Sequence, residues 1–204
     1  MVLEIRELRK KDHKKAIGYA IKGMNFNAYL ESKLGLWLYG RYFWDLELTN
    51  ATQVIAAYMG DELAGVLLAD IKGEKKAYRS FGKSLYVRFV DLIQRVFFKE
   101  GVGPYDKANS EMLAEYRRHN SPDGEIRFLA ADPHIKAKGI GTLLLRELEK
   151  REKGRQIYLF TDDRCTYQFY EHRGFDRVGE RDIEMEMNGR RVSLKCLLYS
   201  KKII

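Results

Sequence analysis

Cysteine and proline are scarce in this sequence, and both shortages limit what it can be. Two cysteines and three prolines occur in 204 residues. Two cysteines cannot build a disulfide framework, and neither has a second Cys or a His at zinc-finger spacing. Of the two, Cys165 and Cys196, we interpret Cys165 as a small, semi-buried side chain, with a reactive thiol as the alternative.

Long hydrophobic runs are also missing. No apolar run approaches the roughly 18 residues that are needed to cross a bilayer, and the densest stretch, 34–44, is interrupted by glycine and arginine. The first residues alternate and then carry charge, unlike the unbroken apolar segment of a signal peptide. We therefore expect an intracellular protein, most simply a cytoplasmic one, that does not associate with a membrane.

Positive charge is in excess, with 37 Lys and Arg against 29 Asp and Glu and a net charge of +8. A basic surface attracts anions, either nucleic acid or a nucleotide cofactor that carries phosphates. The basic residues are spread along the chain, and no helix-turn-helix, zinc or RNA-recognition signature occurs. Nucleic acid is therefore the weaker of the two interpretations.

The spacing of apolar residues predicts strands and helices that follow one another without an internal repeat or a linker. We expect strands at about 3–8, 53–58, 63–71, 125–131, 157–160, 177–187 and 191–199. We expect helices at about 12–24, 34–48, 80–99, 110–118, 140–154 and 166–173. This order predicts a single α+β domain, residues 1–204, around a curved sheet, with a helical insert at about 72–124.

The segment 129–142 carries the strongest chemical signal. A strand is expected to end near Asp132 and a helix to begin near Gly139. The first N–H groups of a helix lack internal partners and, with the helix dipole, bind phosphate oxygens. Glycines at 139 and 141 let an anion approach the main chain, and Lys136 and Lys138 add positive charge. This favours a pyrophosphate site, although the glycines could instead permit tight packing of the helix on a strand.

The sequence PHIKAKGIGT at 133–142 closely resembles motif A of the GCN5-related N-acetyltransferases (GNAT), in which this turn holds the pyrophosphate of coenzyme A. The resemblance implies a mixed, curved sheet of about seven strands flanked by helices. The helical insert expected between the third and fourth strands departs from the family, which usually has a short turn there. The resemblance also implies acetyl-CoA as cosubstrate and no metal. By the same resemblance, the pyrophosphate site consists of Lys136, Ala137, Lys138, Gly139, Ile140, Gly141 and Thr142.

A second segment, DDRCTYQFYEHRGF at 162–175, resembles motif B of the same family. The resemblance assigns Tyr170 as the acid that protonates the leaving sulfur, with Tyr167 as the fallback and a packing role as the alternative. Asp163 stands where the family often has Asn and is counted among the cofactor-binding residues. In the family the strand before motif A splays from its neighbour, so Leu129 and Ala131 are expected to bind the pantetheine arm.

These features together predict an N-acetyltransferase that moves an acetyl group from acetyl-CoA to a primary amine by direct attack on the thioester. A small amine is the favoured acceptor, and a non-catalytic acyl-CoA-binding module is the alternative. The sequence leaves the general base open between Asp132, Glu125 and a residue of the insert, and we interpret His134 and His172 as solvated. It also leaves open a homodimer, and whether the insert is a lid, a dimer surface or core.

Overall fold

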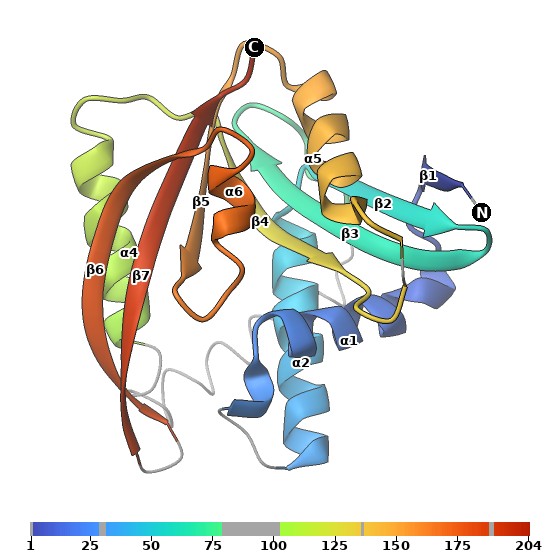
Figure 1. Ribbon diagram of the computed structural model, residues 1–204, viewed down its shortest axis with the longest axis horizontal. Coiled ribbons are helices and arrows are strands. Elements are labelled where there is room, and N and C mark those ends of the chain that lie inside the picture. The colour runs from blue at the N-terminus through green and yellow to red at the C-terminus, as the bar shows by residue number, and fades with distance from the viewer. Residues whose placement is uncertain (1, 29–31, 79–102, 136, 188–189) are drawn as a thin grey trace.

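The computed structural model describes residues 2–28, 32–78, 103–135, 137–187 and 190–204, and its centre is a seven-stranded mixed sheet (Figure 1). The strand order is β1-β2-β3-β4-β5-β7-β6, and β4 and β5 form the parallel pair. The strands are β1 Leu3–Arg6, β2 Gln53–Met59, β3 Glu62–Ile71, β4 Gly124–Ala131, β5 Gln156–Asp162, β6 Asp176–Met187 and β7 Arg190–Lys202. The predicted fold class is confirmed.

Helices cover both faces of the sheet. They are α1 His13–Gly23, α2 Lys33–Asn50, α4 Gly103–Tyr116, α5 Ile140–Arg151 and α6 Gln168–Glu171, with short 3-10 turns at Lys10–Asp12 and Phe26–Ala28. In Figure 1, α5 and α6 lie in front of the sheet, whereas α1, α2 and α4 lie behind it. Three hydrophobic clusters follow this division: one beneath α5 and α6, one beneath α1 and α2, and one between α4 and the β5–β7–β6 half.

Helix α1 begins where the sequence predicts, but its first turn is held differently. Asp12 occupies the N-cap position, yet its side chain caps no helical N–H group. The carboxylate instead accepts hydrogen bonds from Arg9 Nε at 2.7 Å and from the Tyr58 hydroxyl at 2.9 Å. Because Asp12 Oδ2 accepts from Arg9 and from the Tyr58 hydroxyl on β2, the carboxylate holds the start of α1 against the sheet instead of capping the helix.

Several predicted boundaries shift by a few residues. The polar helix expected at 110–118 begins earlier, at Gly103, and the helix expected at 166–173 is reduced to four residues before Gly174. The helix predicted at 80–99 and the Asn188–Gly189 turn lie outside the described residues. Of the helices in the described ranges, none has the length and apolar character that a membrane span requires.

Candidate active site

The sheet opens between β4 and β5. These parallel neighbours pair at Gly124↔Ile157 and Glu125↔Tyr158, although β4 continues to Ala131 and β5 to Asp162. On the other side of β4 the register with β3 shifts, because Phe128 faces Leu68 whereas Ile126 faces Ala69. Arg127 is thus an extra residue in β4. A bulge of this kind bends its strand, and the bend carries β4 away from β5.

Unpaired backbone groups of β4 face this opening. Asp132 N donates to Ala64 O on β3 at 2.7 Å. Successive N–H groups of a strand point to opposite sides, so those of Ala131 and Leu129 point away from β3 and toward β5. The two residues expected to bind a pantetheine arm therefore present main-chain donors to the opening.

The opening leads to the first turn of α5. Gly139 has φ +87°, a left-handed conformation that favours glycine, and no side chain caps this helix end. The backbone bond from Leu143 N to Gly139 O, 2.8 Å, is the first of the helix. The N–H groups of Ile140, Gly141 and Thr142 therefore have no partner within the helix, as anion binding at a helix start requires.

The two glycines of this turn have different roles. A Cβ on Gly139 would meet no atom within 4 Å, so this residue is needed for its backbone conformation. A Cβ on Gly141 would lie 3.0 Å from Phe169 Cε2 and 3.5 Å from Leu129 Cδ2. Gly141 therefore permits close packing of α5 against α6, and the packing interpretation applies to this position.

The other predicted members of the turn differ in exposure. Ala137 is half-buried against the cluster beneath α5, Lys138 is exposed, and Ile140 is buried. Lys136 lies outside the described residues. Among the described residues of this turn, Lys138 is therefore the lysine whose exposed side chain can face an anion.

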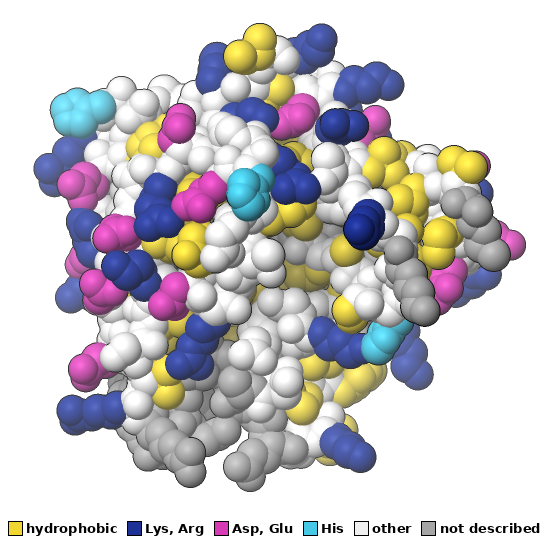
Figure 2. All heavy atoms as spheres, viewed as in Figure 1, with side chains coloured by type: hydrophobic (Ala, Val, Ile, Leu, Met, Phe, Trp, Pro, Cys, Tyr) yellow, Lys and Arg dark blue, Asp and Glu magenta, His cyan; other side chains and the backbone are white. Residues whose placement is uncertain are grey.

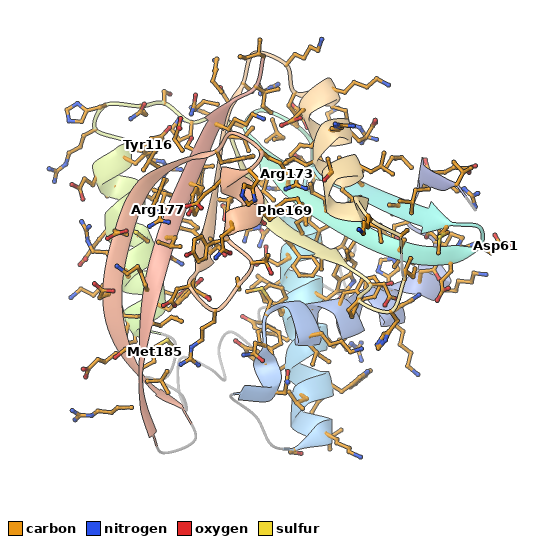
Figure 3. All side chains as sticks on the ribbon, viewed as in Figure 1. Asp61, Tyr116, Phe169, Arg173, Arg177 and Met185 are labelled. Atoms are coloured by element: carbon orange, nitrogen blue, oxygen red, sulfur yellow. The ribbon has the colours of Figure 1, made fainter. Side chains whose placement is uncertain are left out.

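Arg173 adds a second positive charge that sequence reasoning missed. Its guanidinium lies over the Phe169 ring at 3.7 Å, and its Nε donates to Thr142 Oγ1 at 3.1 Å. Figure 3 shows Arg173 and Phe169 together between α6 and α5. The only sequence signal was its place just before Gly174 in motif B.

Tyr170 packs beneath α6 on the α5 face of the sheet. Its ring is 5.7 Å from that of Phe175 and 5.1 Å from that of Phe169. Burial, together with the nearby Cys165 thiol, raises the pKa of Tyr170. A phenol carries its proton at neutral pH, and the raised pKa makes Tyr170 a weaker acid than a solvated tyrosine. Its ring contacts serve the packing role.

Tyr167, the fallback acid, is half-buried near Tyr170. Its ring packs against the cluster beneath α5, and the Arg177 guanidinium lies 5.5 Å from the ring centroid.

Two of the candidate bases have opposite environments. Asp132 accepts hydrogen bonds from Lys15 Nζ at 2.9 Å, the Tyr19 hydroxyl at 3.1 Å and His134 N at 2.9 Å. Burial opposes ionisation of Asp132, but these donors prevail and lower its pKa. Asp132 is therefore a weak base that is already engaged.

Glu125 lies where β4 and β5 separate. Its Oε2 accepts from the Tyr158 hydroxyl at 3.2 Å and from Arg127 NH1 at 3.3 Å. Burial raises the pKa of Glu125 despite the Arg127 charge. Arg127 pairs more closely with Glu47 of α2, at 2.5 Å, which places Glu125 on the α2 face of the sheet.

The remaining candidates lie elsewhere. Asp163 Oδ1 accepts from Lys195 N at 3.1 Å and so extends the β5–β7 ladder. His134 is exposed beside Lys22 Nζ at 2.8 Å, and His172 is exposed. Cys196 is buried and Cys165 half-buried, and burial raises the pKa of the Cys165 thiol to about 11.

The molecular surface is hollowed at the opening. Figure 2 shows a depression with hydrophobic side chains at its floor, seen from the α5–α6 side. A separate polar cavity of about 430 Å³ lies at the amino end of β5, beside Gln156 and Ser200, and is remote from the turn at Gly139. Within the described ranges, no group of three or more His, Cys, Asp or Glu side chains is placed to hold a metal ion.

Residues 104–175 match the model of the acetyltransferase (GNAT) family, and no curated protein matches the chain. The matched stretch starts at α4, includes the opening and the turn at Gly139, and ends just beyond Gly174. The resemblance seen in the sequence motifs is thus confirmed.

Solved structures share the fold over nearly the whole chain. A histone acetyltransferase HPA2 and related acetyltransferase from Corynebacterium glutamicum is 14% identical, with a TM-score of 0.59 over 100% of this chain and 98% of that one. The PaiA N-acetyltransferase of Thermoplasma acidophilum, solved with coenzyme A, is 16% identical, with a TM-score of 0.54 over 99% of both chains. The ribosomal-protein-S18-alanine N-acetyltransferase of Escherichia coli is 13% identical, with a TM-score of 0.51 over 99% of this chain and 94% of that one.

Proposed function

Since the chain has the GNAT fold and its residues 104–175 match the model of that acetyltransferase family, we propose that it is an N-acetyltransferase that moves an acetyl group from acetyl-CoA to the primary amine of a small acceptor. The observation that carries this proposal is the opening between β4 and β5, which runs to the uncapped, glycine-led start of α5. One domain, residues 1–204, with the insert at about 72–124, would house the reaction in the cytoplasm.

The described residues suit coenzyme A. The N–H groups of Ile140, Gly141 and Thr142 would bind the pyrophosphate, and Lys138 and Arg173 would supply positive charge. The pantetheine arm would lie in the opening, where Leu129 and Ala131 offer main-chain donors. Bound there, the arm would extend toward the place where β4 and β5 separate.

The chemistry needs a base and an acid on opposite sides of the thioester. The amine must lose a proton to attack the carbonyl carbon, and the departing thiolate must gain one when the C–S bond breaks. Glu125, whose pKa burial raises, would accept the first proton on the α2 face. Tyr170, whose phenol carries a proton at neutral pH, would supply the second on the α5 face. Holding both reactants between them supplies the remaining acceleration.

Acetyl-CoA binding is the first test, by isothermal titration. Lys138→Glu puts a carboxylate at the start of α5, where the helix dipole tolerates it but the pyrophosphate is repelled. We expect the Kd for acetyl-CoA to rise about tenfold or more, whereas Lys153→Glu, beyond the other end of α5, should leave it unchanged. Absence of binding by the unaltered protein at millimolar acetyl-CoA would refute the proposal.

Turnover is the second test, followed by thiol release with primary amines. Tyr170→Phe should lower kcat about a hundredfold and leave the Kd for acetyl-CoA unchanged, because it removes only the acidic proton. Acetyl-CoA binding without turnover of any amine would instead indicate the non-catalytic acyl-CoA-binding module.

A further inference from the structure

The bulge in β4 gives this strand two neighbouring side chains on the same face of the sheet. Ile126 packs in the cluster beneath α5 and Phe128 in the cluster beneath α1 and α2, although residues two apart in a regular strand share a face. Arg127, the extra residue between them, pairs with Glu47 of α2 and therefore also points to the α2 face. Bulges re-aim side chains in this way, and they are common next to active sites.

Glu47 holds the guanidinium of Arg127 in one orientation. Arg127 Nε donates to Glu47 Oε2 at 2.5 Å, and its NH2 donates to Glu47 Oε1 at 3.3 Å. Such two-point pairing fixes the plane of a guanidinium. The Glu47 side chain is only 10% exposed, so the pair is largely shielded from water. The remaining nitrogen, NH1, is then directed at Glu125 Oε2, 3.3 Å away.

Glu125 is held by one of its two oxygens. Oε2 accepts from Arg127 NH1 and from the Tyr158 hydroxyl of β5, whereas Oε1 accepts no hydrogen bond from a described residue. The Glu125 side chain is 21% exposed, and Glu125↔Tyr158 is the last pair before β4 and β5 separate. An amine in the opening therefore meets a carboxylate whose second oxygen is available.

Two carboxylates share the positive charge of Arg127. Burial raises the pKa of Glu47 and that of Glu125, and Arg127 opposes both shifts. The other charged groups around Glu125 are its register partner Asp70 on β3, Lys76, which pairs with Asp70 at 2.7 Å, and Arg117 after α4. Of these groups, Arg127 is the cation that contacts the Glu125 carboxylate.

We propose that Arg127 is a positioning residue for acetyl transfer: Glu47 fixes its guanidinium, which holds Oε2 of Glu125 so that Oε1 faces the amine in the opening. This inference rests on the proposed function, in which Glu125 is the base. Arg127 acts through Glu125 and does not touch the substrate. The bulge that bends β4 away from β5 thus also supplies the residue that orients the base.

The pH dependence of kcat/KM tests this role, with saturating acetyl-CoA and hexylamine or alaninamide as the amine. Arg127→Met removes the cation beside Glu125, so the pKa of Glu125 should rise and the acid limb of the profile should move up by about one pH unit. Glu47→Gln removes the competing carboxylate and leaves the guanidinium to Glu125, so the limb should move down. The proton of the amine itself contributes equally to every variant and cancels in the comparison.

Binding and rate complete the comparison. In Arg127→Met and Glu47→Gln the maximal kcat should fall about tenfold, because the carboxylate is no longer held in place. The Kd for acetyl-CoA should stay unchanged. Arg155→Met is the matched control, since it takes an arginine from Glu152, a carboxylate only 3% exposed at the end of α5, 3.0 Å away. It should lower the melting temperature and leave the acid limb in place.

An acid limb that stays in place, or that moves in the same direction in Arg127→Met and Glu47→Gln, would overturn the inference. Arg127→Met leaves Glu47 buried without its cation, which costs stability. If that variant does not fold, the double variant Glu47→Gln, Arg127→Met decides, because its limb should lie above that of Glu47→Gln alone. An unaltered protein that binds no acetyl-CoA or acetylates no amine would instead refute the proposed function, and this result needs no variant.

Discussion

At the scale of single residues, Glu125 and Asp132 lie seven positions apart in the β4 segment and have opposite pKa shifts. Asp132 accepts hydrogen bonds from three donors. Glu125 accepts one from the Tyr158 hydroxyl and one from the guanidinium of Arg127, which pairs more closely with Glu47. The number and kind of neighbouring donors therefore separate an engaged carboxylate from one that can accept a proton.

This difference predicts the pH dependence of activity. Glu125 must be ionised to act as a base, so kcat/KM should fall as pH drops through its pKa, which burial raises above the ordinary 4.5. Glu125→Gln should remove this acid limb and lower kcat about a hundredfold. The measurement is a pH–rate profile by thiol release, with Asp132→Asn as the control that keeps the limb. If Glu125→Gln kept the same acid limb as the unaltered protein, Glu125 would not be the base.

At the scale of elements, the position of α5 depends on a glycine in β3. A Cβ on Gly65 would lie 2.7 Å from Ile140 Cγ2 and 2.9 Å from Ala130 O, which is backbone and cannot rotate away. The helix that begins with the proposed pyrophosphate site can sit this close to the sheet only because Gly65 has no side chain.

Gly65→Ala should therefore destabilise the protein by about 2–3 kcal/mol and displace the first turn of α5. Gly18→Ala in α1 is the matched control, since a Cβ there meets no atom within 4 Å. That change should raise stability by about 0.5–1 kcal/mol, as alanine is the better helix former. Urea unfolding of both variants checks the pair, and an equal effect at the two sites would contradict the account.

At the scale of the whole molecule, Asp132 joins α1 to the turn that leads into α5. Lys15 and Tyr19 reach it from α1, and His134 N reaches it from the turn. Because the folded protein lowers the pKa of Asp132, this carboxylate stabilises the fold above its ordinary value of 3.8, and the contribution is lost as pH falls through the lowered pKa.

Asp132→Asn should accordingly lower the free energy of unfolding by about 1.5–3 kcal/mol near neutral pH. The deficit should shrink as pH falls below the ordinary value, because the carboxyl group of the unaltered protein then becomes neutral as well. Urea titrations of both proteins at neutral and at acid pH measure this, and a deficit independent of pH would show that the charge of Asp132 is not what stabilises the contact.

The sequence by itself determined the order of most elements, the fold class and the segments whose motifs resemble the GNAT family. Apolar periodicity located the strands and most helices, because it records which face of each element is buried. The glycines at 139 and 141 with the motif around Tyr170 indicated the family, since local main-chain conformation needs particular residues at fixed spacing. These signals are local in the chain and can be read one segment at a time.

Tertiary structure decided what depends on contacts between distant segments. The bulge at Arg127, the charge pair of Arg127 with Glu47 on α2 and the contact of Arg173 with Thr142 join residues 31 to 80 positions apart, and no local pattern encodes them. The same holds for the opposite pKa shifts of Glu125 and Asp132. Burial and hydrogen-bond partners set pKa values and unmet polar groups, and both exist only once the chain has folded.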